Sequence, residues 1–335
     1  MHYLFCLALF FFKEKVMNKF MGMLAAAVLC AGAWAGDYAE LVPENADGAV
    51  CLYPSVFMAS EFGKAVLAQG ENQAKSLGMD AKEMEEKTGF NPERDLQRLT
   101  VAVVKAQEEE FYMVAEGKFD VKKIEEAVAA KNFKDYKAQD RNGFRQLSFI
   151  AEEKAQPIFL ALSAEKTLMA PSEAALDGGV NVVTGKAKNA KGVALFANKA
   201  AEGTGKLFVE CVFDVAKQVN TAQGVPPQMD DLKNINAAAL FLTEQPDKKL
   251  ALTVDLLMND AASATKLKQM AEGFLKMFGA QLPVAQQVKL AAKESRLTAV
   301  LALSMDEIKD LTKMAAGSVM GADVDAAGDD DDDDE

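Results

Sequence analysis

Histidine and tryptophan are almost absent from this chain, with one of each among 335 residues. Both of them, His2 and Trp34, lie in the first 35 positions, a segment with the pattern of an export signal. Once that segment is removed, the remaining chain has no imidazole to act as a general base or to bind zinc. The composition therefore excludes Ser-His-Asp and Cys-His hydrolases as functions of the exported form.

The N-terminal segment predicts export. Residues Met17 to Ala35 combine Lys19, a long apolar run and the small residues Ala33 and Ala35, which suit cleavage after Ala35. Residues 1–16 hold a second apolar run, so we interpret Met17 as the natural start. The alternative is a membrane anchor, but both runs are shorter than the ~20 apolar residues of a spanning helix. We expect a periplasmic or extracellular protein with no integral membrane span after cleavage.

Cysteine is scarce, with four residues in the chain. Cys6 and Cys30 would leave with the signal, and Leu29 is not the small residue that a lipoprotein needs before Cys30. The other two, Cys51 and Cys211, lie in apolar, strand-like runs. In an oxidising compartment they could form one disulfide, and the alternative is two buried thiols that pack as small apolar groups. Only geometry decides between the two, so the sequence leaves both open.

Negative charge is concentrated at the C-terminus. The net charge is −13, and nine acidic residues lie between Asp323 and Glu335. Residues 317–335 have little to bury and repel one another, so we expect a disordered acidic tail. The tail lacks the ligand spacing of an EF-hand, which leaves only loose cation binding. The candidates for it are Asp329, Asp330 and Asp331. The rest of the chain has no basic patch for nucleic acid, and no cofactor is expected.

A strand followed by a capped helix is the clearest local pattern. Residues 250–258 alternate apolar and polar side chains, and Asp260 is placed to cap a helix that Gly279 ends. Six residues at helical spacing predict one apolar stripe that faces the core: Leu267, Met270, Ala271, Phe274, Leu275 and Phe278. We expect Met258, Met270, Met277, Met305 and Met314 to be core residues as well, rather than the lining of an adaptable cleft.

The same plan occurs earlier, as a strand at 111–119, a cap at Asp120 and a helix from Val121. Two further matches support a repeat: Asp95-Leu96 with Asp231-Leu232, and Leu160 to Ser163 with Leu301 to Ser304. We therefore expect an α+β protein of two pseudo-repeated units, 36–190 and 191–316. Short turns between strands predict a mostly antiparallel sheet in each unit, with helices packed on one face.

No motif assigns a catalytic residue. Ser163 and Lys166 have the S-x-x-K spacing of serine acyl-transferases, but a helix cap at Ser163, like the one expected at Ser304, is the better interpretation. Residues 203–206 resemble a phosphate loop but lack its spacing. The paired carboxylates that could serve hydrolysis lie in predicted turns and are Asp230-Asp231, Glu108 to Glu110 and Glu152-Glu153.

The short elements of the chain resemble those of exported bacterial proteins of unknown function with tandem α+β halves. They are Leu41-Val42-Pro43, Gly89 to Pro92 with Asp95-Leu96, Gly117 to Asp120, and Asn198 with Gly205-Lys206-Leu207. The resemblance covers residues 38–314 and implies no activity. We expect an exported, non-catalytic protein that binds another protein or an apolar ligand, or that serves as an envelope scaffold. The alternative is a histidine-free hydrolase that uses carboxylates, with or without a divalent cation.

Overall fold

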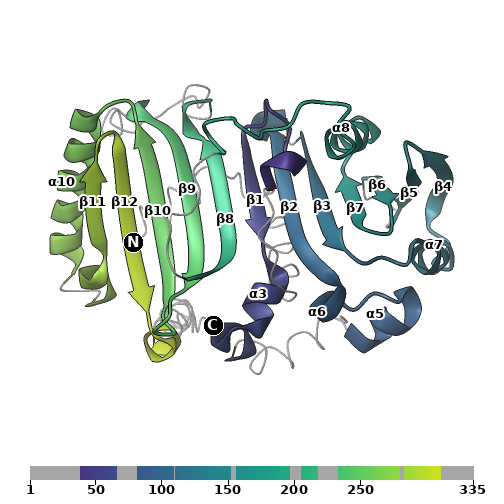
Figure 1. Cartoon of the computed structure of the whole chain (residues 1–335), viewed down its shortest axis with the longest axis horizontal. Helices are drawn as coiled ribbons and strands as arrows, with labels where there is room; N and C mark the ends of the chain where they lie inside the picture. Colours follow the sequence, from purple (N-terminus) through teal and green to yellow (C-terminus); the bar gives the residue numbers. More distant parts are fainter. Residues whose placement is uncertain are drawn as a thin grey trace, which may run out of the picture.

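The computed structural model describes residues 38–65, 81–108, 110–151, 156–196, 205–217, 233–279 and 283–310. They form one antiparallel sheet of twelve strands with helices against it, so the protein is mixed α/β with most of its structure in the sheet (Figure 1). In the part of the chain described, we find no helix with the length and apolar character needed to cross a bilayer.

The strands cross the sheet in the order β11-β12-β10-β9-β8-β1-β2-β3-β7-β6-β5-β4. Their bounds are β1 Gly48–Leu52, β2 Leu96–Lys105, β3 Glu110–Gly117, β4 Lys134–Arg141, β5 Phe144–Ile150, β6 Ile158–Leu162, β7 Lys166–Ala170, β8 Lys206–Asp214, β9 Ile235–Glu244, β10 Leu250–Met258, β11 Lys289–Lys293 and β12 Arg296–Leu303. The expectation of a separate sheet in each half is wrong. Strand β1 pairs with β8, with Val50 opposite Cys211, so the two halves form one continuous sheet. This pairing satisfies the backbone N–H and C=O groups that two separate sheets would leave unpaired at their edges.

The helices lie on both faces of the sheet. Their bounds are η1 Tyr38–Leu41, α3 Pro54–Ala59, α5 Ala81–Thr88, α6 Pro92–Asp95, η2 Ala106–Glu108, α7 Val121–Ala129, α8 Glu173–Val183, α10 Ala261–Phe278 and η4 Pro283–Gln287. We call the side that η1 and α8 cover the α8 face. On the other side, α10 packs Ala264 near Leu256 and Ala238, which point away from the α8 face. The expectation that the helices share one face is therefore wrong.

Helix starts follow the predicted caps. The side chain of Asp120 accepts a hydrogen bond from the Lys123 amide at the start of α7, and that of Asp260 accepts one from Ser263 at the start of α10. Ser304 and Glu307 form the expected reciprocal pair, with Ser304 Oγ 2.7 Å from a Glu307 carboxylate oxygen. These caps are local in sequence, so each satisfies free backbone amides without any long-range contact.

Ser163 does not cap a helix. Its backbone amide donates to the Lys166 carbonyl oxygen at 2.8 Å, and the Lys166 amide donates to Ser163 Oγ at 3.0 Å. This closes a tight turn between β6 and β7, so the sequence-based cap is wrong here. Leu160–Leu162 lie in β6, which is separated from β3 by β7. Leu301–Leu303 lie in β12, which pairs directly with β10. The match of Leu160–Ser163 with Leu301–Ser304 is therefore not a match of positions in the sheet.

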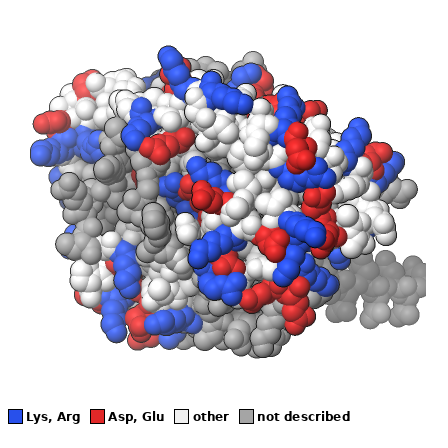
Figure 2. All heavy atoms as spheres, turned by 45° about the vertical axis from the view of Figure 1, so that its right-hand side comes forward, with Lys and Arg blue, Asp and Glu red and all other residues white. Residues whose placement is uncertain are grey.

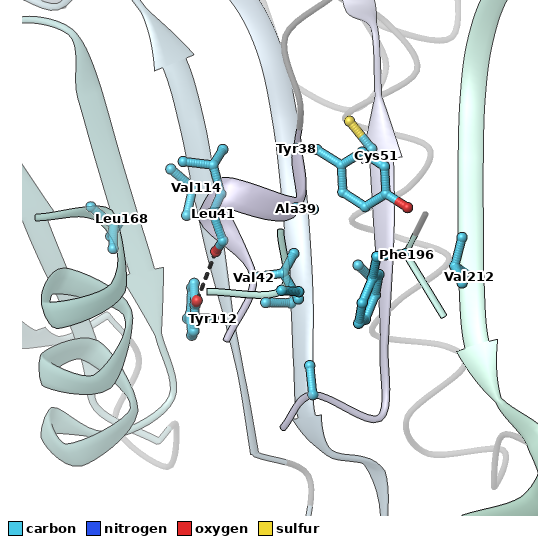
Figure 3. Packing of buried hydrophobic residues seen from close by; sticks show 14 of the residues in the cluster. Tyr38, Ala39, Leu41, Val42, Cys51, Tyr112, Val114, Leu168, Phe196 and Val212 are labelled. Atoms are coloured by element: carbon cyan, nitrogen blue, oxygen red, sulfur yellow. Dashed lines mark hydrogen bonds between the residues drawn. The ribbon is translucent and has the colours of Figure 1, made fainter. Parts of the chain in front are cut away.

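The largest buried cluster lies between the α8 face and the segments that cover it (Figure 3). Tyr112 is 1% exposed and its hydroxyl donates to the Leu41 carbonyl oxygen at 2.7 Å, which fastens η1 to the sheet. Phe196 packs edge-on against Tyr38 at 6.4 Å between ring centroids. Residues from both ends of 38–196 thus share one core with Val212 of β8.

Both edges of the sheet carry charged side chains. The strand β4, sequence KDYKAQDR, is almost fully exposed, and Asp135 there has a positive φ of 54°. At the other edge, β11 begins and ends with the exposed residues Lys289 and Lys293. Charges and irregular backbone at an edge hinder pairing with another chain, so the edges are poor sites for adding a strand.

Candidate functional site

One row of side chains crosses the whole sheet without a charged, amide or hydroxyl group. Cross-strand partners in an antiparallel sheet point to the same face, so the register identifies the row. From β11 to β4 it consists of Leu290, Ala299, Val254, Leu240, Cys211, Val50, Val101, Met113, Met169, Leu160, Leu147 and Ala138. At the usual strand spacing the row is about 50 Å long.

Two flanking rows extend this apolar surface over the middle of the sheet. One consists of Leu301, Leu252, Leu242, Val209, Leu52 and Leu99. The other consists of Leu297, Leu256, Ala238, Phe213, Gly48, Val103 and Phe111. We call the three rows together the apolar face; it is the side of the sheet opposite α8.

The apolar face is covered unevenly. Val50, Leu52 and Val101 at its centre are 2–5% exposed. Leu240, Leu252 and Val254 in the second half are partly exposed. At one end α10 packs beside Leu256, and α3 packs Phe57 against Phe208 near Leu242. The strip of the sheet between these two helices is a partly exposed apolar surface, the kind of surface that binds apolar ligands or protein partners.

The α8 face has a different chemistry along the adjacent row. From β11 to β4 that row consists of Lys289, Val300, Thr253, Phe241, Glu210, Cys51, Thr100, Val114, Leu168, Ala161, Gln146 and Gln139. Polar groups interrupt it in both halves. The two faces therefore differ in kind, and only one of them is apolar from edge to edge along a full row.

A buried polar cluster lies on the α8 face where the halves meet. Glu210 is 5% exposed, and the Tyr38 hydroxyl donates to its carboxylate at 3.4 Å. Thr100 Oγ1 lies 3.7 Å from Cys51 Sγ, and both residues are fully buried. Burial raises the pKa of the Cys51 thiol to about 12, and it also raises the pKa of the Tyr38 and Tyr53 hydroxyls. Since thiol and phenols stay protonated near neutral pH, the cluster holds no ready nucleophile.

Cys51 and Cys211, for which the sequence left open either a disulfide or two buried thiols, are free in the structure. Cys51 is paired with Glu210, and Cys211 with Val50, so their thiols point to opposite faces of the sheet. Within the described residues no group of three or more acidic, cysteine or histidine side chains could hold a metal ion. The cation candidates Asp329, Asp330 and Asp331 lie outside those residues.

The catalytic candidates are not brought together. The Lys166 amine is 3.7 Å from a Glu116 carboxylate oxygen, and Ser163 Oγ donates to the Lys166 backbone carbonyl at 2.9 Å. Glu108 and Glu110 flank the Lys105 amine at 2.9 and 3.7 Å, as a surface charge group. The pairs at 152–153 and 230–231, and the loop at 203–204, lie outside the described residues.

A shallow hollow of about 570 Å³ lies between the start of α7 and the β4–β5 turn. Two arginines line it, but each already has carboxylate partners. Arg145 forms two bonds to Glu125, at 2.9 and 2.6 Å, and Arg141 is 2.9 Å from Asp177. Figure 2, which brings this end of the molecule forward, shows acidic and basic side chains interspersed. The hollow therefore offers no concentrated charge for an anionic ligand.

Alternation in the sequence identifies single strands such as 250–258, but the apolar face also needs the pairing register, which no motif encodes. Val50 and Cys211, which are 161 positions apart in the sequence, are neighbours in it. The chain matches no protein-family model, no curated protein and no solved structure.

Proposed function

We propose that the protein is an exported, non-catalytic binding protein and that its binding surface is the apolar face of the sheet. The observation that carries the proposal is the row of twelve uncharged, mainly large apolar residues that runs across every strand. The strip between α3 and α10 is partly exposed and includes Leu240, Leu252 and Val254. Such a surface suits a long apolar ligand, for which contact area matters more than directed hydrogen bonds.

The alternative of a carboxylate-based hydrolase gains no support from the acidic groups. A general acid needs a carboxyl group whose pKa is raised toward neutrality. Basic neighbours instead lower the pKa of Asp95 beside Arg94, of Glu125 beside Arg145 and of Glu40 beside Lys191. Carboxylates in such pairs stay ionised and serve as structural anchors.

We also propose that the two halves of the sheet arose by duplication. From the central pair outward, β1-β2-β3 and β8-β9-β10 have the same order, and each third strand leads through an aspartate cap into a helix. Farther out, β7 and β6 follow β3 as β12 and β11 follow β10, and the halves differ in that β5 and β4 of the first half have no counterpart beyond β11. On this proposal the apolar face is two half-faces joined at β1 and β8.

A fluorescent fatty acid titrated into the full chain tests the proposed function. We expect saturable binding with a micromolar Kd, and release on addition of an excess of non-fluorescent fatty acid. Leu252→Thr should weaken binding by about tenfold, the equivalent of about 1.4 kcal/mol. Thr253→Val, one residue along and on the other face, is the matched control and should leave the Kd unchanged. Non-saturable binding, or equal effects of the two variants, would contradict the proposal.

A further inference from the structure

The outer side of α10 carries large apolar residues that the sequence pattern assigns to the core. Met270 is 36% exposed, Phe274 50% and Met277 61%. Their spacing of four and three places them on one side of the helix. The inner side is already occupied, since Ala264 is fully buried with Met258 and Ile235. The expectation of core positions for Met270, Phe274 and Met277 is therefore wrong: α10 packs at the end of the sheet, and these three residues lie on its exposed side.

A glycine lies in the middle of this outer side. Gly273 is exposed, and a Cβ at that position would meet nothing within 4 Å. Glycine inside a helix costs about 1 kcal/mol relative to alanine, and the fold gives no internal reason for it here. A bare backbone between Met270 and Phe274 does allow another chain segment to approach closely. We call Met270, Gly273, Phe274 and Met277 the α10 stripe.

The stripe lies in a basic part of an acidic protein. Residues 261–293 contain a single acid, Glu272, and five lysines: Lys266, Lys268, Lys276, Lys289 and Lys293. Lys268 pairs with Glu272 at 3.3 Å. Lys276, Lys289 and Lys293 form no ion pair within the described part of the chain and are exposed. An apolar strip beside exposed lysines matches a segment that is both acidic and partly apolar.

The chain contains such a segment, and it begins close by. Gln286 donates to the Gly279 carbonyl oxygen at the end of α10 at 2.9 Å, and Gln287 donates to Glu307 at 2.6 Å. These contacts place the last described helical turn, which follows Ser304, near the C-terminal end of α10. Figure 1 shows β12 and α10 ending at the same lower end of the sheet. Residues 317–335 follow after a short connection and contain Val319, Met320 and nine acidic residues.

We propose that residues 317–335 bind the α10 stripe of their own chain, with Val319 and Met320 against Phe274 and Met277 and the acidic run against the lysines. Reach is sufficient: α10 is about 27 Å long, and nineteen extended residues span about 60 Å. Tethering at one end supplies a local concentration in the millimolar range, so weak contacts are enough. The tail needs no fold of its own for this, and an outside acidic partner would have to displace it.

The test compares the full chain with a chain that ends at Ala316. We expect hydrogen exchange of the α10 amides to be several-fold faster in the shorter chain, with the same melting temperature to within a few degrees. A synthetic peptide of residues 317–335 should bind the shorter chain with a micromolar Kd. Salt at 1 M should weaken binding by tenfold or more, because the lysines are exposed and screened.

Variants separate this proposal from a purely structural role of the stripe. Phe274→Ser with Met277→Ser should abolish peptide binding without unfolding, since both side chains are exposed. Gly273→Gln should raise the melting temperature, because glutamine has the higher helix propensity. It should also weaken binding of the peptide, because its side chain blocks close approach to the helix backbone. Lys64→Gln, an exposed lysine at the end of the α3 region, is the charge control and should change nothing.

Three results would overturn the proposal. One is identical α10 exchange in both chains together with no binding of the peptide. Another is a dimer, present in both chains, that Phe274→Ser dissociates, because a second copy would then cover the stripe. The third is equal binding of both chains to vesicles containing anionic lipid, because a tail that occupies the stripe has to compete with that surface.

Discussion

Cys51 and Cys211 lie on adjacent strands at the centre of the molecule, and their thiols point to opposite faces of one sheet. Cys51 belongs to the buried cluster of the α8 face, whereas Cys211 packs beside Val50 on the apolar face. A disulfide between them would require one strand to turn over, since the side chains of neighbouring positions alternate between faces. Each cysteine thus serves the packing of its own face.

Both thiols should therefore stay free, even after export into an oxidising compartment. Alkylation of the unfolded, non-reduced chain without residues 1–35 should label two cysteines, whereas the folded form at pH 8 should react very slowly. Burial raises the pKa of both thiols to about 12, so almost no thiolate is present at that pH. Mass spectrometry counts the labels, and a mass two units lower with no label would show a disulfide.

Stability should fall in alkaline solution. The Cys51 and Cys211 thiols have a folded-state pKa of about 12 against an ordinary value of 9.0, so the folded chain holds protons that the unfolded chain releases. Their contribution is complete below pH 9 and is lost as the pH rises toward 12, by up to about 1.4 kcal/mol per pH unit and group. Chemical denaturation between pH 8 and 10.5 measures this slope. In Cys51→Ala with Cys211→Ala the slope should be shallower, and an unchanged slope would contradict the assignment.

Two adjacent glycines in α8 should respond to alanine in opposite ways. A Cβ on Gly179 would lie 2.9 Å from the buried Tyr112 ring, whereas a Cβ on Gly178 would meet nothing within 4 Å. Gly179→Ala should lower the free energy of unfolding by about 1–3 kcal/mol, because the ring is held by its bond to Leu41. Gly178→Ala should raise it by about 0.5–1 kcal/mol through helix propensity. Urea denaturation of both variants provides the measurement. A lower free energy of unfolding in both variants would show that the contact with Tyr112 does not distinguish the two positions.

The pair formed by Arg98 and Glu116 should matter far more than a surface pair on the same sheet. Both side chains are largely buried, at 9% and 18% exposure. Glu116→Ala removes a carboxylate partner from the largely buried Arg98 guanidinium and should cost about 3 kcal/mol. Glu108→Ala removes an exposed partner of Lys105 and should change the free energy of unfolding by less than about 0.5 kcal/mol. Equal effects in thermal or urea unfolding would show that the buried pair is dispensable.

Local signals in the sequence identified most elements, and long-range geometry decided the rest. The strand at 250–258 and the caps at Asp120 and Asp260 follow from patterns within about ten residues, and the structure confirms them. Glycine commonly ends a helix, yet α8 continues through Gly178 to Val183. The reason is distant in sequence, because Gly179 lets the helix approach Tyr112.

The candidate site could not be predicted from local sequence patterns either, because it too depends on contacts between distant parts of the chain. Helical spacing predicts that Leu267 and Phe274 share an inward stripe, but which part of a stripe faces the core depends on where the sheet ends. The helix α10 lies at the end beside the short edge strand β11, so Leu267 is partly buried and Phe274 is half exposed. The apolar face likewise depends on pairing between strands that are far apart in the chain.

The junction of the halves gives the last prediction. Gly48 lies opposite Phe213 where β1 meets β8, and a Cβ there would approach the Val212 carbonyl oxygen to 2.6 Å and the Phe213 ring to 2.3 Å. Backbone has to shift to accept it, so Gly48→Ala should lower the free energy of unfolding by about 2–3 kcal/mol, the upper part of the range for overpacking. Because both halves share this pair of strands, the loss should appear as one shifted transition in the circular dichroism of the sheet and the fluorescence of the tyrosines. Two separate transitions in the unsubstituted chain would show instead that the halves fold independently, and that the β1–β8 pairing does not couple them.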